Sequence, residues 1–110
     1  MAVSYAEDLV NPDQNIIDVL VKTLNYDKNV NVRMAAAYAL SKFADQGAVC
    51  DSLVKSLAFQ EDPILQITLI NILAERREKS AFKTIQDIIS NKNTINEVRV
   101  VAQNSLGVLI

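Results

Sequence analysis

The sequence predicts an all-α fold, an α-solenoid in which antiparallel helix pairs stack side by side. Three observations predict it: an internal repeat, a shortage of helix-breaking residues, and apolar side chains that recur every fourth position. Half of the 110 residues are hydrophobic, and the chain has only two glycines and two prolines. That composition favours helices over a β fold rich in turns.

The repeat becomes visible when the chain is aligned with itself. Residues 20–24 (LVKTL) align with residues 53–57 (LVKSL) at an offset of 33 positions, and residues 1–6 align with 34–39 at the same offset. A constant period of this length is typical of repeat arrays, in which each unit buries its apolar face against its neighbours. We expect a single repeat domain over residues 1–110, a fragment of a longer protein, with these parts: the end of a preceding unit at 1–10, unit one at 11–44, unit two at 45–77 and unit three at 78–110.

Unit one is predicted to contain two helices separated by a polar turn at residues 25–29. The first helix begins near Asn11-Pro12-Asp13, because Asn is a good N-cap and Pro suits the first helical position. Ile16, Leu20 and Leu24 then recur every fourth residue, as on the buried face of a helix. The second helix is expected to bury one stripe, made of Val32, Ala35, Ala36, Ala39, Leu40 and Phe43.

Unit two follows the same plan. Its first helix is lined by Val49, Leu53 and Leu57, and Asp62-Pro63 is the start signal of its second helix. The buried stripe of that second helix is predicted to consist of Leu65, Thr68, Leu69, Ile72 and Leu73.

Unit three has a turn that is one residue longer than the turns of the other units. The extra residue makes room for a capping box, Thr94-x-x-Glu97, so its second helix is predicted to begin near Ile95. Apolar residues surround much of this last helix, which lacks the polar outer face of a capping repeat. We therefore expect this end to be able to associate with a second copy through Val98, Val100, Val101, Val108, Leu109 and Ile110.

The chain lacks the residues that most enzymes and metal sites need. It has no histidine and one cysteine, Cys50, so Cys/His catalysis and Cys/His metal binding are excluded. The carboxylates are scattered at helix starts and turns, and the two glycines are isolated. We therefore predict no catalytic, cofactor-binding or metal-ligating residues, and no enzyme. A net charge of −2 without a basic block also disfavours nucleic-acid binding.

No apolar run approaches the length of a membrane span, and the N-terminus lacks the pattern of a signal peptide. We expect a soluble domain without membrane contact of its own, cytoplasmic by default and periplasmic if a membrane span precedes it.

The segment Asp27-x-x-x-x-Val32-Arg33-x-Ala35-Ala36-x-x-Ala39-Leu40 resembles the HEAT repeat, in the short form of phycobilin-lyase-like arrays. The resemblance implies a right-handed, armadillo-like superhelix of about seven helices. In HEAT proteins, an Asp in the turn and an Arg six places later form a ladder between units, and Asp27 and Arg33 match that pair. Gln60 with Gln66, and Asn93 with Arg99, depart from it.

In a HEAT solenoid the second helices line the concave side. The positions opposite the predicted stripe are apolar in all three units, and polar residues edge them. An exposed apolar patch with a polar rim is typical of an interaction surface. The predicted interaction surface consists of Met34, Ala37, Tyr38, Ile67, Ile70, Asn71, Ala74, Val100 and Asn104.

These observations favour a non-catalytic module or scaffold that binds an unidentified protein or a second copy. The chain is also similar, more faintly, to the HEAT segment of bacterial membrane-tethered proteins with an anti-sigma-like zinc finger, carried by the Val-Arg-x-Ala-Ala motif and by Gln66 to Ile70. That similarity implies a regulatory C-terminal part of such a protein. The alternatives are an enzyme-associated, lyase-like HEAT array and a nucleic-acid-binding HEAT array.

Overall fold

The structure, a computed structural model, describes residues 14–110. These residues form six α-helices, one 3₁₀-helix and no strand, which confirms the predicted all-α solenoid. The predicted helix start at residues 11–13 and the predicted half unit at 1–10 lie outside the described residues. In chain order, the elements are α2 (Gln14–Tyr26), α3 (Val30–Ser41), α4 (Gly47–Phe59), α5 (Pro63–Glu75), η1 (Lys79–Ala81), α6 (Phe82–Ser90) and α7 (Asn96–Leu109).

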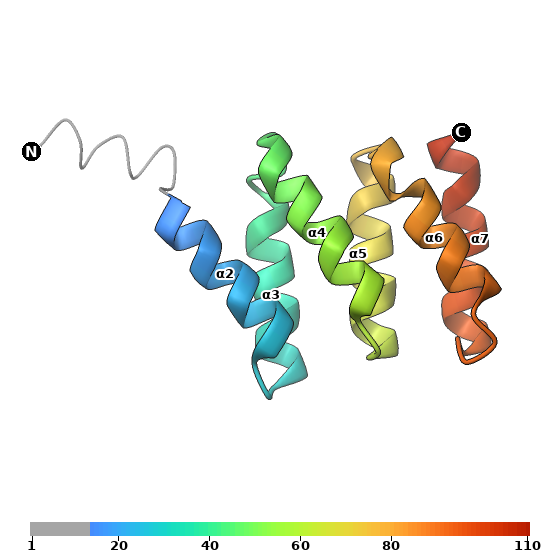
Figure 1. Ribbon diagram of the computed structural model, residues 1–110, viewed down its shortest axis with the longest axis horizontal. Coiled ribbons are helices and arrows are strands. Elements are labelled where there is room, and N and C mark those ends of the chain that lie inside the picture. Colours follow the sequence, from blue (N-terminus) through green and yellow to red (C-terminus); the bar gives the residue numbers. More distant parts are fainter. Residues whose placement is uncertain (1–13) are drawn as a thin grey trace, which may run out of the picture.

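The helices form two layers. In Figure 1, α2, α4 and α6 make the nearer layer, and α3, α5 and α7 make the farther one. Each helix packs against its antiparallel partner in the other layer and against the equivalent helix of the next unit in its own layer. A helix in the middle of a layer, such as α5, therefore has neighbours on three sides, in α3, α4 and α7.

A row of leucines fills the space between the layers. Leu24 and Leu57 occupy the same position in successive first helices, and Leu40 and Leu73 do so in successive second helices. All four side chains are 0% exposed. Burying a leucine contributes about 1.5–3 kcal/mol, so the repeated leucines supply a large part of the stability of the array.

Helix α5 begins and ends with local hydrogen bonds. The Asp62 carboxylate accepts hydrogen bonds from the backbone N–H groups of Ile64 (2.9 Å) and Leu65 (3.1 Å), which confirms the predicted start. At the other end, Arg77 adopts a left-handed conformation with φ of 54°, and the N–H of Glu78 donates to the carbonyl of Leu73 (2.9 Å). This is a Schellman turn, which reverses the chain toward η1.

The predicted capping box at the start of α7 is not formed. Thr94 Oγ1 donates instead to the carbonyl of Ile88 (2.7 Å), and Ile95 is the N-cap residue without a side-chain cap. The longer turn carries Thr94 back toward α6, where its hydroxyl satisfies a carbonyl at the end of that helix. The helix begins at Asn96, one residue after the predicted start.

The first unit is open on the side where another unit would stack. Val32 is 41% exposed, whereas Leu65 and Val98, its equivalents in the next two units, are 0% exposed. Ala35 is exposed as well, while its equivalent Thr68 is only 7% exposed. The prediction that Val32 and Ala35 are buried is therefore wrong for residues 14–110, since no preceding helix pair covers them there.

The last helix is less apolar on its outside than predicted. Val98 and Leu109 are buried against the core, at 0% and 3% exposed, so they do not contribute to an apolar end surface. Val100, Val108 and Ile110 are exposed, as expected. The predicted self-association surface is reduced to these three residues and the half-buried Val101.

The position shared by Val32 and Leu65 offers a matched test of stacking. We expect Leu65→Ala to lower the free energy of unfolding by about 2–4 kcal/mol, because the side chain is fully buried. Val32→Ala should cost less than about 1 kcal/mol, because this side chain remains 41% exposed. Urea unfolding followed by circular dichroism measures both. Equal losses for the two variants would contradict the described end of the array.

Candidate functional site

The outer surface of α3, α5 and α7 carries apolar and amide side chains at equivalent positions. Tyr38 is 50% exposed, and Asn71 and Asn104, its equivalents in the next units, are also exposed. Ile64 (54% exposed) and Val108 (42% exposed) lie one or two turns away from these amides, although neither belongs to the predicted interaction surface. We call this surface the second-helix face; its residues are Tyr38, Ile64, Ile67, Asn71, Val100, Asn104 and Val108.

Two residues predicted for this surface are in the core. Ala37 and Ile70 are both 0% exposed, so the prediction that they are accessible is wrong. Both belong to the buried core, and α3 and α5 each pack against the next helix of the same layer. The equivalent residue of the last unit is Gln103, which is exposed because no described helix follows α7.

The other predicted positions are partly or fully accessible. Met34, Ile67 and Ala74 are half-buried at the contacts between neighbouring second helices. Val100 has no described helix beyond it and is 48% exposed. The outermost row is thus the one that contains Tyr38 and the two asparagines, rather than the one that contains Met34.

A shallow hollow lies between α5 and α7 on this face. It has a volume of about 280 Å³, and its lining includes Asn71, Ala74, Asn104 and Val108. A second hollow shares Asn71, Ala74 and Val108 and extends toward Glu75 and Arg77. The two hollows together form a groove that follows the C-terminal halves of the two helices.

The predicted pair between Asp27 and Arg33 is not formed. The Asp27 carboxylate accepts a hydrogen bond from the N–H of Asn29 (2.9 Å) and so closes the turn before α3. Arg33 Nε donates to the carbonyl of Leu24 (2.9 Å), and its Nη2 donates to Oε1 of Gln60 in the next unit. Arg33 therefore does connect two units, but through an amide in place of the expected carboxylate.

A short chain of neutral hydrogen bonds continues this connection. Gln60 is 5% exposed, and its Nε2 donates to Ser56 Oγ (3.0 Å). Ser56, fully buried on α4, donates in turn to Oδ1 of Asn25 in unit one (2.7 Å). These bonds satisfy polar groups that would otherwise be buried without partners between α2 and α4.

Cys50 is a packing residue. Its side chain is 4% exposed, and its Sγ lies 3.2 Å from the carbonyl oxygen of Ala44. Burial, together with the smaller effect of the nearby Glu78 carboxylate, raises the pKa of the thiol to about 11. A neutral, enclosed thiol is a poor nucleophile and a poor metal ligand.

The described part of the chain shows no group of three or more Cys, Asp or Glu side chains placed to hold a metal ion. Between residues 14 and 110, no helix has the length and apolar character that crossing a membrane requires.

Comparison with known families adds one finding. Residues 16–47, which span α2, α3 and the turn that leads into α4, match the family model of the HEAT repeat. The match supports the HEAT resemblance of unit one, and HEAT repeats generally mediate protein–protein interaction. No curated protein and no solved structure matches the chain.

The enclosure of Cys50 predicts slow reaction with thiol reagents. At pH 8, a thiol with a pKa of about 11 is only ~0.1% thiolate, whereas one with the ordinary pKa of ~8.5 is roughly one-quarter thiolate. We expect Ellman's reagent to label the native protein at least ~100-fold more slowly than the urea-unfolded protein. Rapid labelling of the native protein would contradict this packing.

The same raised pKa predicts how stability depends on pH. The folded state favours the neutral thiol, so the contribution of Cys50 is complete below the ordinary pKa of ~8.5 and is lost as the pH rises toward about 11. Between pH ~8.5 and about 11, the urea midpoint of unfolding should therefore fall less for the Cys50→Ala variant than for the unmodified protein.

Proposed function

We propose that this domain is a non-catalytic protein-interaction module and that its second-helix face binds a segment of a partner protein. The supporting observation is the groove between α5 and α7, in which amide and apolar side chains are accessible side by side. The match to the HEAT repeat at residues 16–47 supports the same class of function.

The two asparagines of the face suit a polypeptide backbone. Asn71 and Asn104 occupy equivalent positions on neighbouring helices, and among the described residues neither side chain makes a hydrogen bond. An amide side chain both donates and accepts, as a peptide unit does. A partner chain that crosses α5 and α7 can therefore bond to both asparagines through its main chain.

The apolar residues of the face would supply most of the binding energy. Ile64, Val100 and Val108 are between 42% and 54% exposed, so each has apolar area left to bury. Covering that area contributes on the order of 1 kcal/mol per residue. After the entropic cost of association, the sum corresponds to a weak or moderate affinity.

The composition of the face disfavours the nucleic-acid alternative. None of the seven residues of the second-helix face is basic, and the groove beside it adds only one arginine, Arg77, next to the acidic Glu75. Binding to nucleic acid depends on Lys and Arg side chains that displace counterions from phosphates.

A more specific hypothesis follows from the fainter resemblance of the sequence. It makes this domain the regulatory C-terminal part of a bacterial, membrane-tethered, anti-sigma-like protein. The hypothesis requires zinc ligands and a membrane-spanning helix in the coding sequence upstream of residue 1, and an upstream sequence without them would rule it out.

Selection of peptides from a displayed random library on the immobilised domain tests the proposed face. We expect enriched peptides to carry apolar side chains, and we expect the double variant Asn71→Ala, Asn104→Ala to weaken their binding by about tenfold, since each lost bond is worth about 0.5–1.5 kcal/mol. Fluorescence anisotropy of the labelled peptides measures the dissociation constants.

Asn15→Ala is the matched control, because Asn15 is an exposed asparagine on α2, in the other layer. It should leave binding unchanged. Peptides that bind the double variant as tightly as the unmodified domain would show that the second-helix face is not the binding site.

A further inference from the structure

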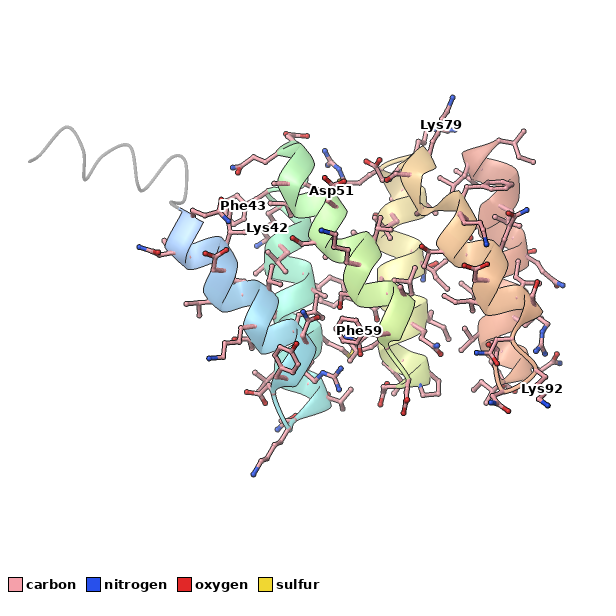
Figure 2. All side chains as sticks on the ribbon, in the orientation of Figure 1. Lys42, Phe43, Asp51, Phe59, Lys79 and Lys92 are labelled. Atoms are coloured by element: carbon pink, nitrogen blue, oxygen red, sulfur yellow. The ribbon has the colours of Figure 1, made fainter. Side chains whose placement is uncertain are left out.

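A second concave site lies along the edge of the array where the turns within the units lie. It is a pocket of about 390 Å³ between the α4–α5 turn and the α6–α7 turn. A smaller pocket of about 130 Å³ continues it inward, and both are lined by Gln60, Gln66, Asn91 and Thr94. Lys92, labelled in Figure 2, marks the α6–α7 turn at this edge. We call the combined space the turn pocket.

The equivalent place between units one and two holds a guanidinium group. Arg33 Nε donates to the carbonyl of Leu24, and its Nη2 donates to the side chain of Gln60 in the following unit. The guanidinium thus bridges the α2–α3 turn and the α4–α5 turn.

The residues at the same register in the next gap are Leu57, Gln66 and Asn93, each 33 positions later. Gln66 takes the place of Arg33 but carries no guanidinium. Its Nε2 donates to the carbonyl of Gln60 in its own unit (3.0 Å), so it does not reach the next turn. Leu57 lines the smaller pocket and Asn93 lines the larger one.

In unit three, as in unit one, an arginine donates a hydrogen bond to a carbonyl at the end of the first helix. Arg99 Nε donates to the carbonyl of Ile89 (3.1 Å), as Arg33 does to Leu24. An arginine therefore binds the end of the first helix in units one and three. Only at the gap after unit two is the guanidinium replaced, and there the pocket lies.

The turn pocket offers acceptors and negative charge. Among the residues described, the side-chain oxygen of Asn93 and the carboxylate of Glu61 accept no hydrogen bond, and both residues are exposed. The Leu57 carbonyl is closed to a ligand, because Leu57 is 0% exposed. The ionisable residues in the lining are Glu61 and Asp87, and no Lys or Arg lines it. Asp87 is paired with Lys83, so the negative charge that faces a ligand comes from Glu61.

We propose that the turn pocket binds the guanidinium group of an arginine side chain presented by a partner protein, between the side-chain oxygen of Asn93 and the carboxylate of Glu61. A planar guanidinium donates from Nε and Nη in two fixed directions and so bridges two acceptors, whereas the ammonium of lysine is a compact point charge. The site is independent of the second-helix face, because the two share no residue.

Titration of the ¹⁵N-labelled domain with N-acetyl-arginine amide, followed by NMR, tests the site. We expect saturable shifts of the side-chain amide signals of Gln66 and Asn93, at millimolar concentrations typical of a probe this small. N-acetyl-lysine amide should bind at least about threefold more weakly, because it cannot bridge the two acceptors.

Two variants address the mechanism directly. Gln66→Arg supplies the guanidinium from within the chain, so it should weaken probe binding by about tenfold and raise the melting temperature by a few degrees. Gln103→Arg adds the same charge at an exposed site on α7 away from the pocket, and it should leave probe binding unchanged. Asn93→Ala, at an exposed turn position, should weaken binding by at least about threefold even if Gln66→Arg does not fold.

Three results would overturn the assignment. They are shifts that do not saturate, equal binding of the lysine and arginine probes, and binding that is unaffected by both Gln66→Arg and Asn93→Ala. Shifts centred on Asn71 and Asn104 would likewise place the arginine on the second-helix face and contradict the turn pocket.

Discussion

The structure depends on the burial of each helix pair against the pair beside it. No unit encloses a core of its own, because two packed helices leave apolar side chains open on both flanks. Leu65 of unit two is 0% exposed, whereas its equivalent Val32 in unit one is 41% exposed, because among the described residues only Leu65 has a preceding unit beside it. The exposed ion pair between Arg76 and Asp45, which lies within unit two, contributes at most about 1 kcal/mol. Apolar packing therefore holds the array together, and polar contacts adjust its register.

The neutral hydrogen bonds between α2 and α4 show how that register is fixed. A continuous path of hydrogen bonds leads from Asn25 in unit one through Ser56 to Gln60 in unit two. At its end, Gln60 also accepts a hydrogen bond from Arg33 of unit one. A shift of one helix along the other would leave these buried groups without partners, at a cost of about 1–3 kcal/mol each. The family resemblance directed attention to a carboxylate, although position 60 carries an amide that can accept from Arg33 and donate to Ser56 at the same time.

Periodicity predicted the helices well because both the spacing of apolar residues and the caps are local properties. The 33-residue offset predicted an array of helix pairs, and Asp62-Pro63 predicted the start of α5 correctly. Periodicity could not show how many neighbours each helix has. A single buried stripe per helix does not describe α5, which is packed on three sides. Ile70, predicted for the surface, is therefore fully buried.

For the candidate sites, departures from the repeat were more informative than the repeat itself. The succession Ala37, Ile70, Gln103 is apolar where another helix follows and polar where the described array ends. Likewise, the change from Arg33 to Gln66 coincides with the turn pocket. Both signals are present in the aligned units, but their meaning depends on knowing which positions face a neighbouring unit.

The two flanks of the array differ in polarity, so added helix pairs would extend it more readily at one end than at the other. Among residues 14–110, Val32 and Ala35 leave an exposed, methyl-rich surface on one flank, while the other flank mixes the polar Asn96 and Gln103 with the apolar Val100 and Ile110. In protein engineering, a consensus helical hairpin grafted ahead of α2 could pack directly on these exposed apolar residues. The same hairpin fused behind α7 would first require the polar residues there to be replaced by apolar ones.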